Sequence, residues 1–78
     1  MPRFFFSVKR GGVVIPDCEG DELPDAAAAV ALASTIVAEM RRLPHIYGEM
    51  REWQKDEFVI TDEAGATVSA APFASFGQ

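Results

Sequence analysis

The stretch DAAAAVALASTIVAEMRRL, residues 25–43, decides the fold because it is the one segment long and periodic enough to predict a helix. At about 100° per residue, its apolar side chains fall within one arc. The members of this arc are Ala29, Val30, Ala33, Ile36, Val37, Met40 and Leu43, with Leu32 at its edge. The pattern predicts a helix that covers a core with one face.

Both ends of this helix carry boundary signals. Asp25 is a candidate N-cap, because its carboxylate can accept from the free N–H groups of the first turn. Arg41 and Arg42 lie in the last turn, where positive charge suits the helix dipole. Pro44 ends the helix, since it lacks an N–H and disfavours a helical residue before it. The opposite side is mostly alanine, which we interpret as helix propensity, with a second contact surface as the alternative.

A hairpin is predicted before the helix, from residues 3–9 (RFFFSVK) and 13–16 (VVIP). The dipeptide Gly11-Gly12 is a two-residue turn signal. Its expected register pairs Arg10 with Val13 and Val8 with Ile15. The residues then expected on the face toward the helix are Phe4, Phe6, Val8, Val13 and Ile15.

A second hairpin is predicted after the helix, from residues 58–62 (FVITD) and 66–71 (ATVSAA). Residues 63–65 form its loop, with Gly65 in the left-handed conformation. This loop pairs Asp62 with Ala66 and Ile60 with Val68. The residues expected to face the helix are Phe58, Ile60, Val68 and Ala70.

These elements predict one α+β domain over residues 1–78, with the order β-β-α-β-β. The expected sheet is a single antiparallel four-stranded one, with the helix on one face and the strands in the spatial order second, first, third, fourth. Residues 44–57 are the least readable segment. We expect a loop there with one helical turn around residues 49–53, and Tyr47, Met50 and Trp53 covering an open end of the core.

Charge and composition exclude several classes. The net charge of −5 disfavours nucleic acid as a partner, although Phe5 with Arg3, Lys9 and Arg10 could suggest a base-stacking platform. Cys18 is the single cysteine, so no intramolecular disulfide can form, and a cytoplasmic location fits. The apolar run at residues 26–38 is too short to span a bilayer.

The order of several short motifs resembles a family of small bacterial proteins of unknown function, common in alphaproteobacteria. The motifs are Met-Pro-Arg followed by aromatics at residues 1–6, Asp-x-Glu-Gly at 17–20, Leu-Pro-Asp at 23–25, the alanine-rich helix, Asp-x-x-Gly at 62–65 and Pro-Phe at 72–73. The sequence departs from the pattern at Phe4, where tyrosine is usual, and at Ser7, where histidine or aspartate is frequent. The resemblance implies the same fold and no known activity.

No residue set predicts a catalytic, cofactor or metal site. Five carboxylates, Asp17, Glu19, Asp21, Glu22 and Asp25, could suggest a Ca²⁺ site, but their spacing does not match an EF-hand, and we interpret them as a solvated turn. Removal of Met1 would expose Pro2 as an N-terminal base like that of small tautomerases. A Cys18–His45 nucleophile pair is the other enzymatic alternative. We expect instead a non-enzymatic binding or regulatory module.

The face of the sheet away from the helix leads us to expect a two-fold homodimer, because a soluble monomer seldom exposes a large apolar surface. The candidate interface residues are Phe5, Val14, Val59, Thr61 and Thr67. The copies could stack these outer faces or join strand edges. In the competing arrangement, aromatic side chains of the same chain cover that face, namely Tyr47, Trp53, Phe73 and Phe76.

Overall fold

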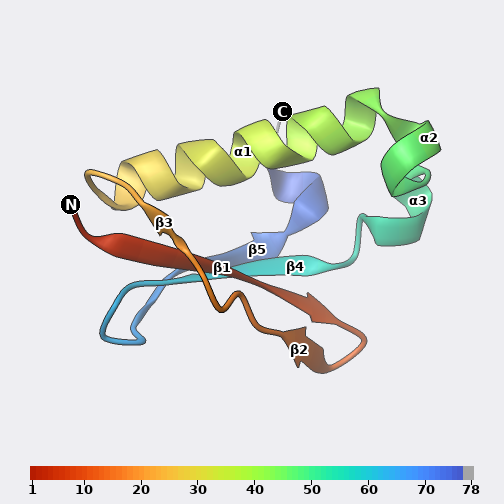
Figure 1. The fold of residues 1–78 in the computed structure, drawn as a ribbon. Coiled ribbons are helices and arrows are strands. Elements are labelled where there is room, and N and C mark those ends of the chain that lie inside the picture. Colours follow the sequence, from red (N-terminus) through yellow and green to blue (C-terminus); the bar gives the residue numbers. More distant parts are fainter. Residues whose placement is uncertain (77–78) are drawn as a thin grey trace.

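A computed structural model describes residues 1–76 and confirms the predicted α+β class (Figure 1). Its elements, in chain order, are β1 (Arg3–Arg10), β2 (Val13–Ile15), β3 (Asp21–Glu22), α1 (Ala26–Arg42), α2 (Pro44–Tyr47), α3 (Met50–Trp53), β4 (Glu57–Thr61), β5 (Thr67–Pro72) and the 3-10 helix η1 (Phe73–Ser75). Helix α1 lies along one face of an antiparallel sheet. None of the helices formed by residues 1–76 is long and apolar enough to cross a membrane.

The main path of the sheet has the order β2-β1-β4-β5, which is the order predicted from the sequence. A fifth strand of two residues, β3, was not predicted. It pairs with the start of β1, Arg3 with Glu22 and Phe4 with Asp21. One edge of β1 therefore carries two short strands, β3 near its beginning and β2 near its end.

Helix α1 begins and ends where the sequence predicts. The Asp25 carboxylate accepts from the Ala28 N–H at 2.8 Å, and Leu43 is the C-cap. The fully buried residues are Ala29, Ala33 and Val37. The prediction that Val30 faces the core is wrong, since this side chain is 36% exposed. The covered arc is therefore narrower than the apolar arc of the sequence and is centred on Ala29, Ala33 and Val37.

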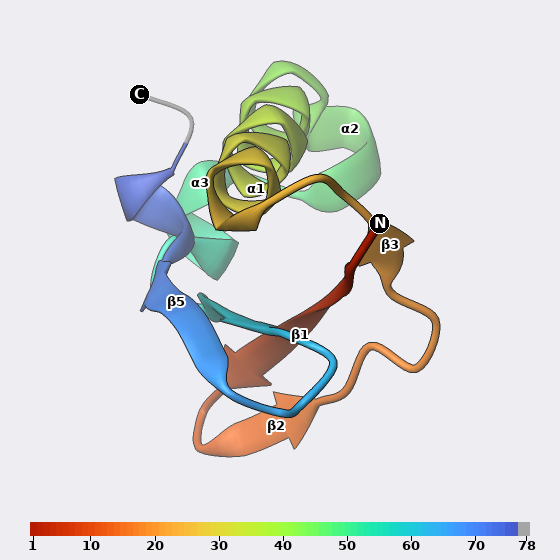
Figure 2. The ribbon, with the colours of Figure 1, turned by 90° about the vertical axis from the view of Figure 1, so that its left-hand side faces the viewer.

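The first hairpin has the predicted register, Arg10 with Val13 and Val8 with Ile15. Gly11 and Gly12 both have positive φ, as a tight two-residue turn requires. The register places Val13 and Ile15 on the predicted face, but the expectation that α1 packs on Ile15 is wrong, since Val13 and Ile15 are 64% and 50% exposed. Strand β2 is an edge strand that lies beyond the part of the sheet that α1 covers. Figure 2 shows this edge at the bottom of the view, well away from the helix.

The second hairpin turns as predicted but then shifts its register. Gly65 has a φ of +84°, and the Asp62 N–H donates to the Ala66 carbonyl at 3.0 Å. A β-bulge next to Ile60 then pairs this residue with Ser69 instead of the predicted Val68. One extra residue in a strand reverses the alternation beyond it. The prediction of Ala70 as a core residue is therefore wrong, and Ala71 packs there instead.

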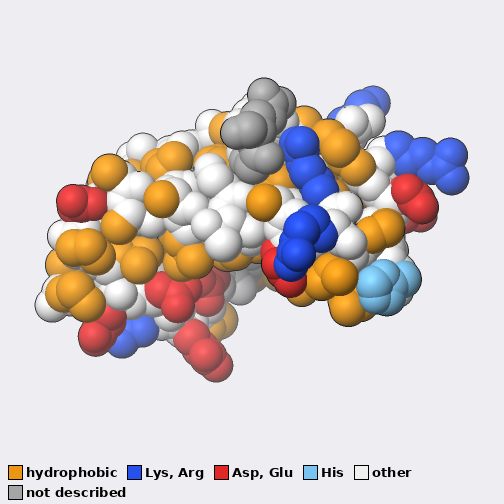
Figure 3. Space-filling view, turned by 90° about the horizontal axis from the view of Figure 1, so that it is seen from above, with side chains coloured by type: hydrophobic (Ala, Val, Ile, Leu, Met, Phe, Trp, Pro, Cys, Tyr) orange, Lys and Arg blue, Asp and Glu red, His pale blue; other side chains and the backbone are white. Residues whose placement is uncertain are grey.

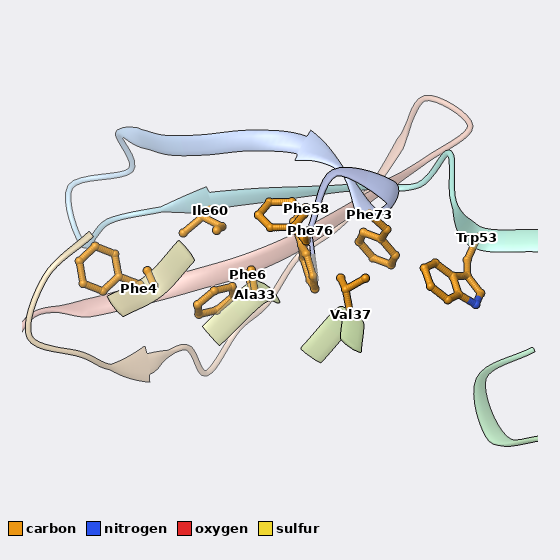
Figure 4. Close-up of a cluster of buried hydrophobic side chains, with 10 residues drawn as sticks. Phe4, Phe6, Ala33, Val37, Trp53, Phe58, Ile60, Phe73 and Phe76 are labelled. Carbon is orange, nitrogen blue, oxygen red and sulfur yellow. The ribbon is translucent and has the colours of Figure 1, made fainter. Parts of the chain in front are cut away.

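Aromatic side chains from β1, α3, β4 and the C-terminal turn form the core on the helix side of the sheet (Figure 4). The Phe58 ring centroid lies 4.4 Å from that of Phe73 and 5.8 Å from that of Phe76. Trp53, from the predicted helical turn α3, is buried beside Phe73. The competing arrangement, in which these side chains cover the outer face of the sheet, is wrong. Tyr47 is also not part of the core, because the short helix α2 leaves it 47% exposed.

Candidate functional site

Strand β2 consists entirely of exposed apolar residues. The three residues of this strand are Val13, Val14 and Ile15, and their exposed fractions are 64%, 53% and 50%. Val13 and Ile15 lie on the helix side of the sheet, and Val14 lies on the outer side. Exposed apolar side chains on both faces of one edge strand are typical of a surface that another chain covers.

The gap between β2 and β3 is closed by a side chain. The Asp17 carboxylate accepts from the backbone N–H of Phe6 at 3.0 Å, in the stretch of β1 that neither short strand pairs. It also accepts from the N–H groups of Glu19 at 3.2 Å and Gly20 at 3.1 Å. Asp17 therefore replaces a strand at this position and holds the chain from β2 to β3 against β1.

Asp17 has a pKa below the ordinary value of an aspartate. Desolvation is the largest single influence and raises its pKa, but the hydrogen bonds from Phe6, Gly20 and Glu19 together outweigh it. Asp17 was predicted to be one of several solvated carboxylates, and its role at the edge of β1 was not predicted. The available signal was an aspartate three residues before a glycine, a pattern typical of side-chain-stabilised turns.

The outer face of the sheet consists of three cross-strand rows. Phe5, Thr61 and Thr67 form the first, and Ser7, Val59 and Ala70 form the second. The third row contains Val14, Lys9, Glu57 and Pro72. The register thus places all five candidate interface residues on one face. Phe5, Val59 and Thr61 are half-buried there, whereas Val14 and Thr67 are exposed.

The residues considered for chemistry lie apart. Pro2 is exposed at the chain start, and its carbonyl accepts from the Leu23 N–H at 3.0 Å. Cys18 is exposed between β2 and β3, while His45 is exposed in α2. No pocket is found at any of them within residues 1–76.

The acidic residues of the turn have separate partners. Asp17 holds the edge of β1, Asp25 caps α1, and Glu22 pairs with Arg3 at 3.1 Å. Nowhere in the described part of the chain do three histidine, cysteine or acidic side chains come together as metal ligands. The carboxylates that are close together in the sequence are therefore spread over the β3 end of the molecule.

Charge is unevenly distributed along the molecule. Seen from above, several basic side chains gather toward the end where α1 finishes, and acidic ones gather toward the end where it begins (Figure 3). The basic residues of the first end include Arg41, Arg42, Arg51 and Lys55. The acidic residues of the second end include Asp21, Glu22, Asp25, Asp62 and Glu63. The first end also carries Glu39, Glu49, Glu52, Asp56 and Glu57, so its charges nearly balance, whereas the second end is acidic. The acidic end lies at the N-terminus of α1, where negative charge suits the helix dipole.

Comparisons with known proteins bear on the whole chain rather than on one site. No curated protein and no solved structure matches it. A family model described as "Domain of unknown function (DUF6894)" matches residues 3–74, which runs from the start of β1 into η1 and includes every strand and all of the core except Phe76. The chain therefore belongs to this family of domains of unknown function.

Proposed function

We propose that this domain is a non-enzymatic module that associates with a second copy of itself, and that the resulting homodimer has a binding or regulatory role in the bacterial cytoplasm. The observation that carries the proposal is the exposure of all three residues of β2. A chain of 78 residues has a small core, and covering these side chains with a second copy adds burial that one chain lacks.

The uncovered outer face supports the same proposal. All helices of the described chain lie on the other side of the sheet or at its end (Figures 1 and 2). The three outer rows hold one lysine, Lys9, and one carboxylate, Glu57, so the face is less charged than most of the surface. The proposal admits two arrangements, one with outer faces stacked and one with strand edges joined.

The mass of the particle in solution tests the proposal. We expect a mass about twice the 8.5 kDa of one chain at micromolar concentration, falling toward 8.5 kDa on dilution. Light scattering coupled to size-exclusion chromatography measures this directly. A mass of one chain that does not change across a hundredfold range of concentration would overturn self-association.

A further inference from the structure

The free backbone groups of the sheet edge can be assigned from one hydrogen bond. The Phe6 N–H points to Asp17, away from β4. Because N–H groups alternate in direction along a strand, those of Val8 and Arg10 point the same way, toward β2. The N–H of Lys9 then points to β4, and the N–H of its cross-strand partner Val14 points away from β1. The N–H and C=O groups of Val14 thus lie on the free edge of β2.

The exposed side chains of β2 show what kind of partner would cover them. Val13 and Ile15 project from one face of the sheet and Val14 from the other. A layer stacked on one face would leave the other face of β2 in water. An added strand bonds to the edge and places side chains on both faces at once.

The opposite edge of the sheet is less suited to receive a strand. Strand β5 contains the β-bulge, and such irregularities protect natural edges. Strand β2 has a regular register and no charged residue. Its protections are its three-residue length and Pro16, which follows it without an N–H group. These features limit the length of strand that can pair with β2, but they do not prevent pairing.

We propose that β2 pairs antiparallel with β2 of a second copy, with the two-fold axis at Val14. This inference rests on the proposed self-association and specifies its geometry. Val13 of one copy then lies opposite Ile15 of the other, so every cross-strand pair is apolar. The result is one continuous sheet with four main-path strands from each copy and both α1 helices on the same face.

The distribution of charge selects the second copy and its direction. Arg10 pairs with Val13 at the turn end of β2, and the other end of the strand is followed by Asp17 and Glu19. The Arg10 guanidinium contacts Asp56 at 2.6 Å, but its side chain is still 62% exposed. Parallel pairing would set Asp17 and Glu19 of the two copies side by side, whereas antiparallel pairing sets this acidic segment beside the turn that carries Arg10 of the other copy.

A proline at the axis tests the edge contact. The substitution Val14→Pro removes the N–H on the free edge of β2. It removes no hydrogen bond between β1 and β2, because the backbone N–H of Val14 points away from β1. We expect the dimer dissociation constant to rise at least tenfold. The matched control Val14→Thr keeps the shape and the N–H, and we expect its constant to stay within about threefold of the wild-type value. Sedimentation of the full chain measures both, and circular dichroism confirms that each variant is folded.

Cross-linking separates the two arrangements even if the proline variant fails to fold. In a Cys18→Ser background, Val14→Cys places two thiols at the axis, about 5.5 Å apart between Cα atoms, and mild oxidation should link the copies. Val59→Cys lies on the outer face and should not link them. A dimer that links through position 59 and tolerates Val14→Pro would overturn edge pairing while keeping self-association. A particle with the mass of one chain would overturn both.

Discussion

The two edges of the sheet differ in how far the rest of the chain covers them. On the β5 side the chain returns as η1, places Phe73 and Phe76 against Phe58, and closes the core. The Arg41 side chain on α1 holds this return by donating to the carbonyls of Ala74 and Phe76, each at 3.2 Å. On the β2 side no segment of residues 1–76 covers the strand, and its three apolar residues stay exposed to water.

The contrast shows how a short chain distributes its limited apolar surface. The closed edge gathers aromatic rings into the core and depends on that packing for stability. The open edge is held by backbone pairing and by the Asp17 carboxylate, with little burial. Side-chain truncations at the two edges should therefore differ strongly in their effect on the free energy of unfolding.

The largest effect is expected at the closed edge. Phe73 is 3% exposed and stacks on Phe58, so Phe73→Ala should lower the free energy of unfolding by about 3–5 kcal/mol through lost burial and a cavity. Such a loss is a large part of the stability of a small domain. Urea denaturation followed by tryptophan fluorescence reports it through the neighbouring Trp53. A loss below about 1 kcal/mol would mean that η1 does not close the core.

An intermediate effect is expected at Asp17, which holds the open edge. Asp17→Ala removes the acceptor of three backbone N–H groups and should cost about 1–2 kcal/mol near pH 7, since solvent weakens these bonds at a half-exposed site. Asp17→Asn keeps one acceptor oxygen and should cost less. Urea denaturation of the three proteins provides the comparison.

The same site predicts a dependence on pH. The pKa of Asp17 is lower in the folded chain than in the unfolded chain, so its ionisation stabilises the fold fully above the unfolded value, about 3.9. This contribution is lost as the pH falls through the lower folded pKa. The difference in stability between wild type and Asp17→Ala should therefore shrink below about pH 4. A difference that stays constant from pH 6 to pH 3 would contradict the ionic role.

The smallest effect is expected at the exposed strand. Ile15 is 50% exposed, so Ile15→Ala should cost less than about 1 kcal/mol at protein concentrations low enough to keep the chain monomeric. At high concentration the cost should grow, because association stabilises the folded chain by mass action. Thermal denaturation across a range of concentrations compares the two conditions. A large loss at low concentration would place Ile15 in the core of the single chain.

The elements bounded by local signals could be predicted. Asp25 and Pro44 set the limits of α1, and Gly11-Gly12 set the register of the first hairpin, because capping and tight turns depend on a few adjacent residues. The positive φ at Gly65 followed from the same kind of reasoning, and the order of the main-path strands followed from general rules for connecting strands. Whether the five candidate residues form a contact surface stays a prediction.

The second hairpin shows where local reasoning ended. Its turn was predicted correctly, but the bulge beside Ile60 moved Ala71 into the core in place of Ala70. Nothing in the alternation of residues 66–71 reveals the extra residue, because small side chains there fit either face. Packing against α1 and the returning tail is the constraint that distinguishes the two registers.

The sequence by itself determined the class, the long helix and both turns, since each follows from residues close together in the chain. The strand order followed from general rules for connecting strands. The tertiary structure alone decided which apolar residues are covered. Ala29, Ala33 and Val37 are buried and Val13 and Ile15 are not, because α1 lies over only part of the sheet. It also decided that Phe73 and Phe76 return to the core and that Asp17 meets Phe6. Such contacts join distant segments, and no periodicity along the chain encodes them.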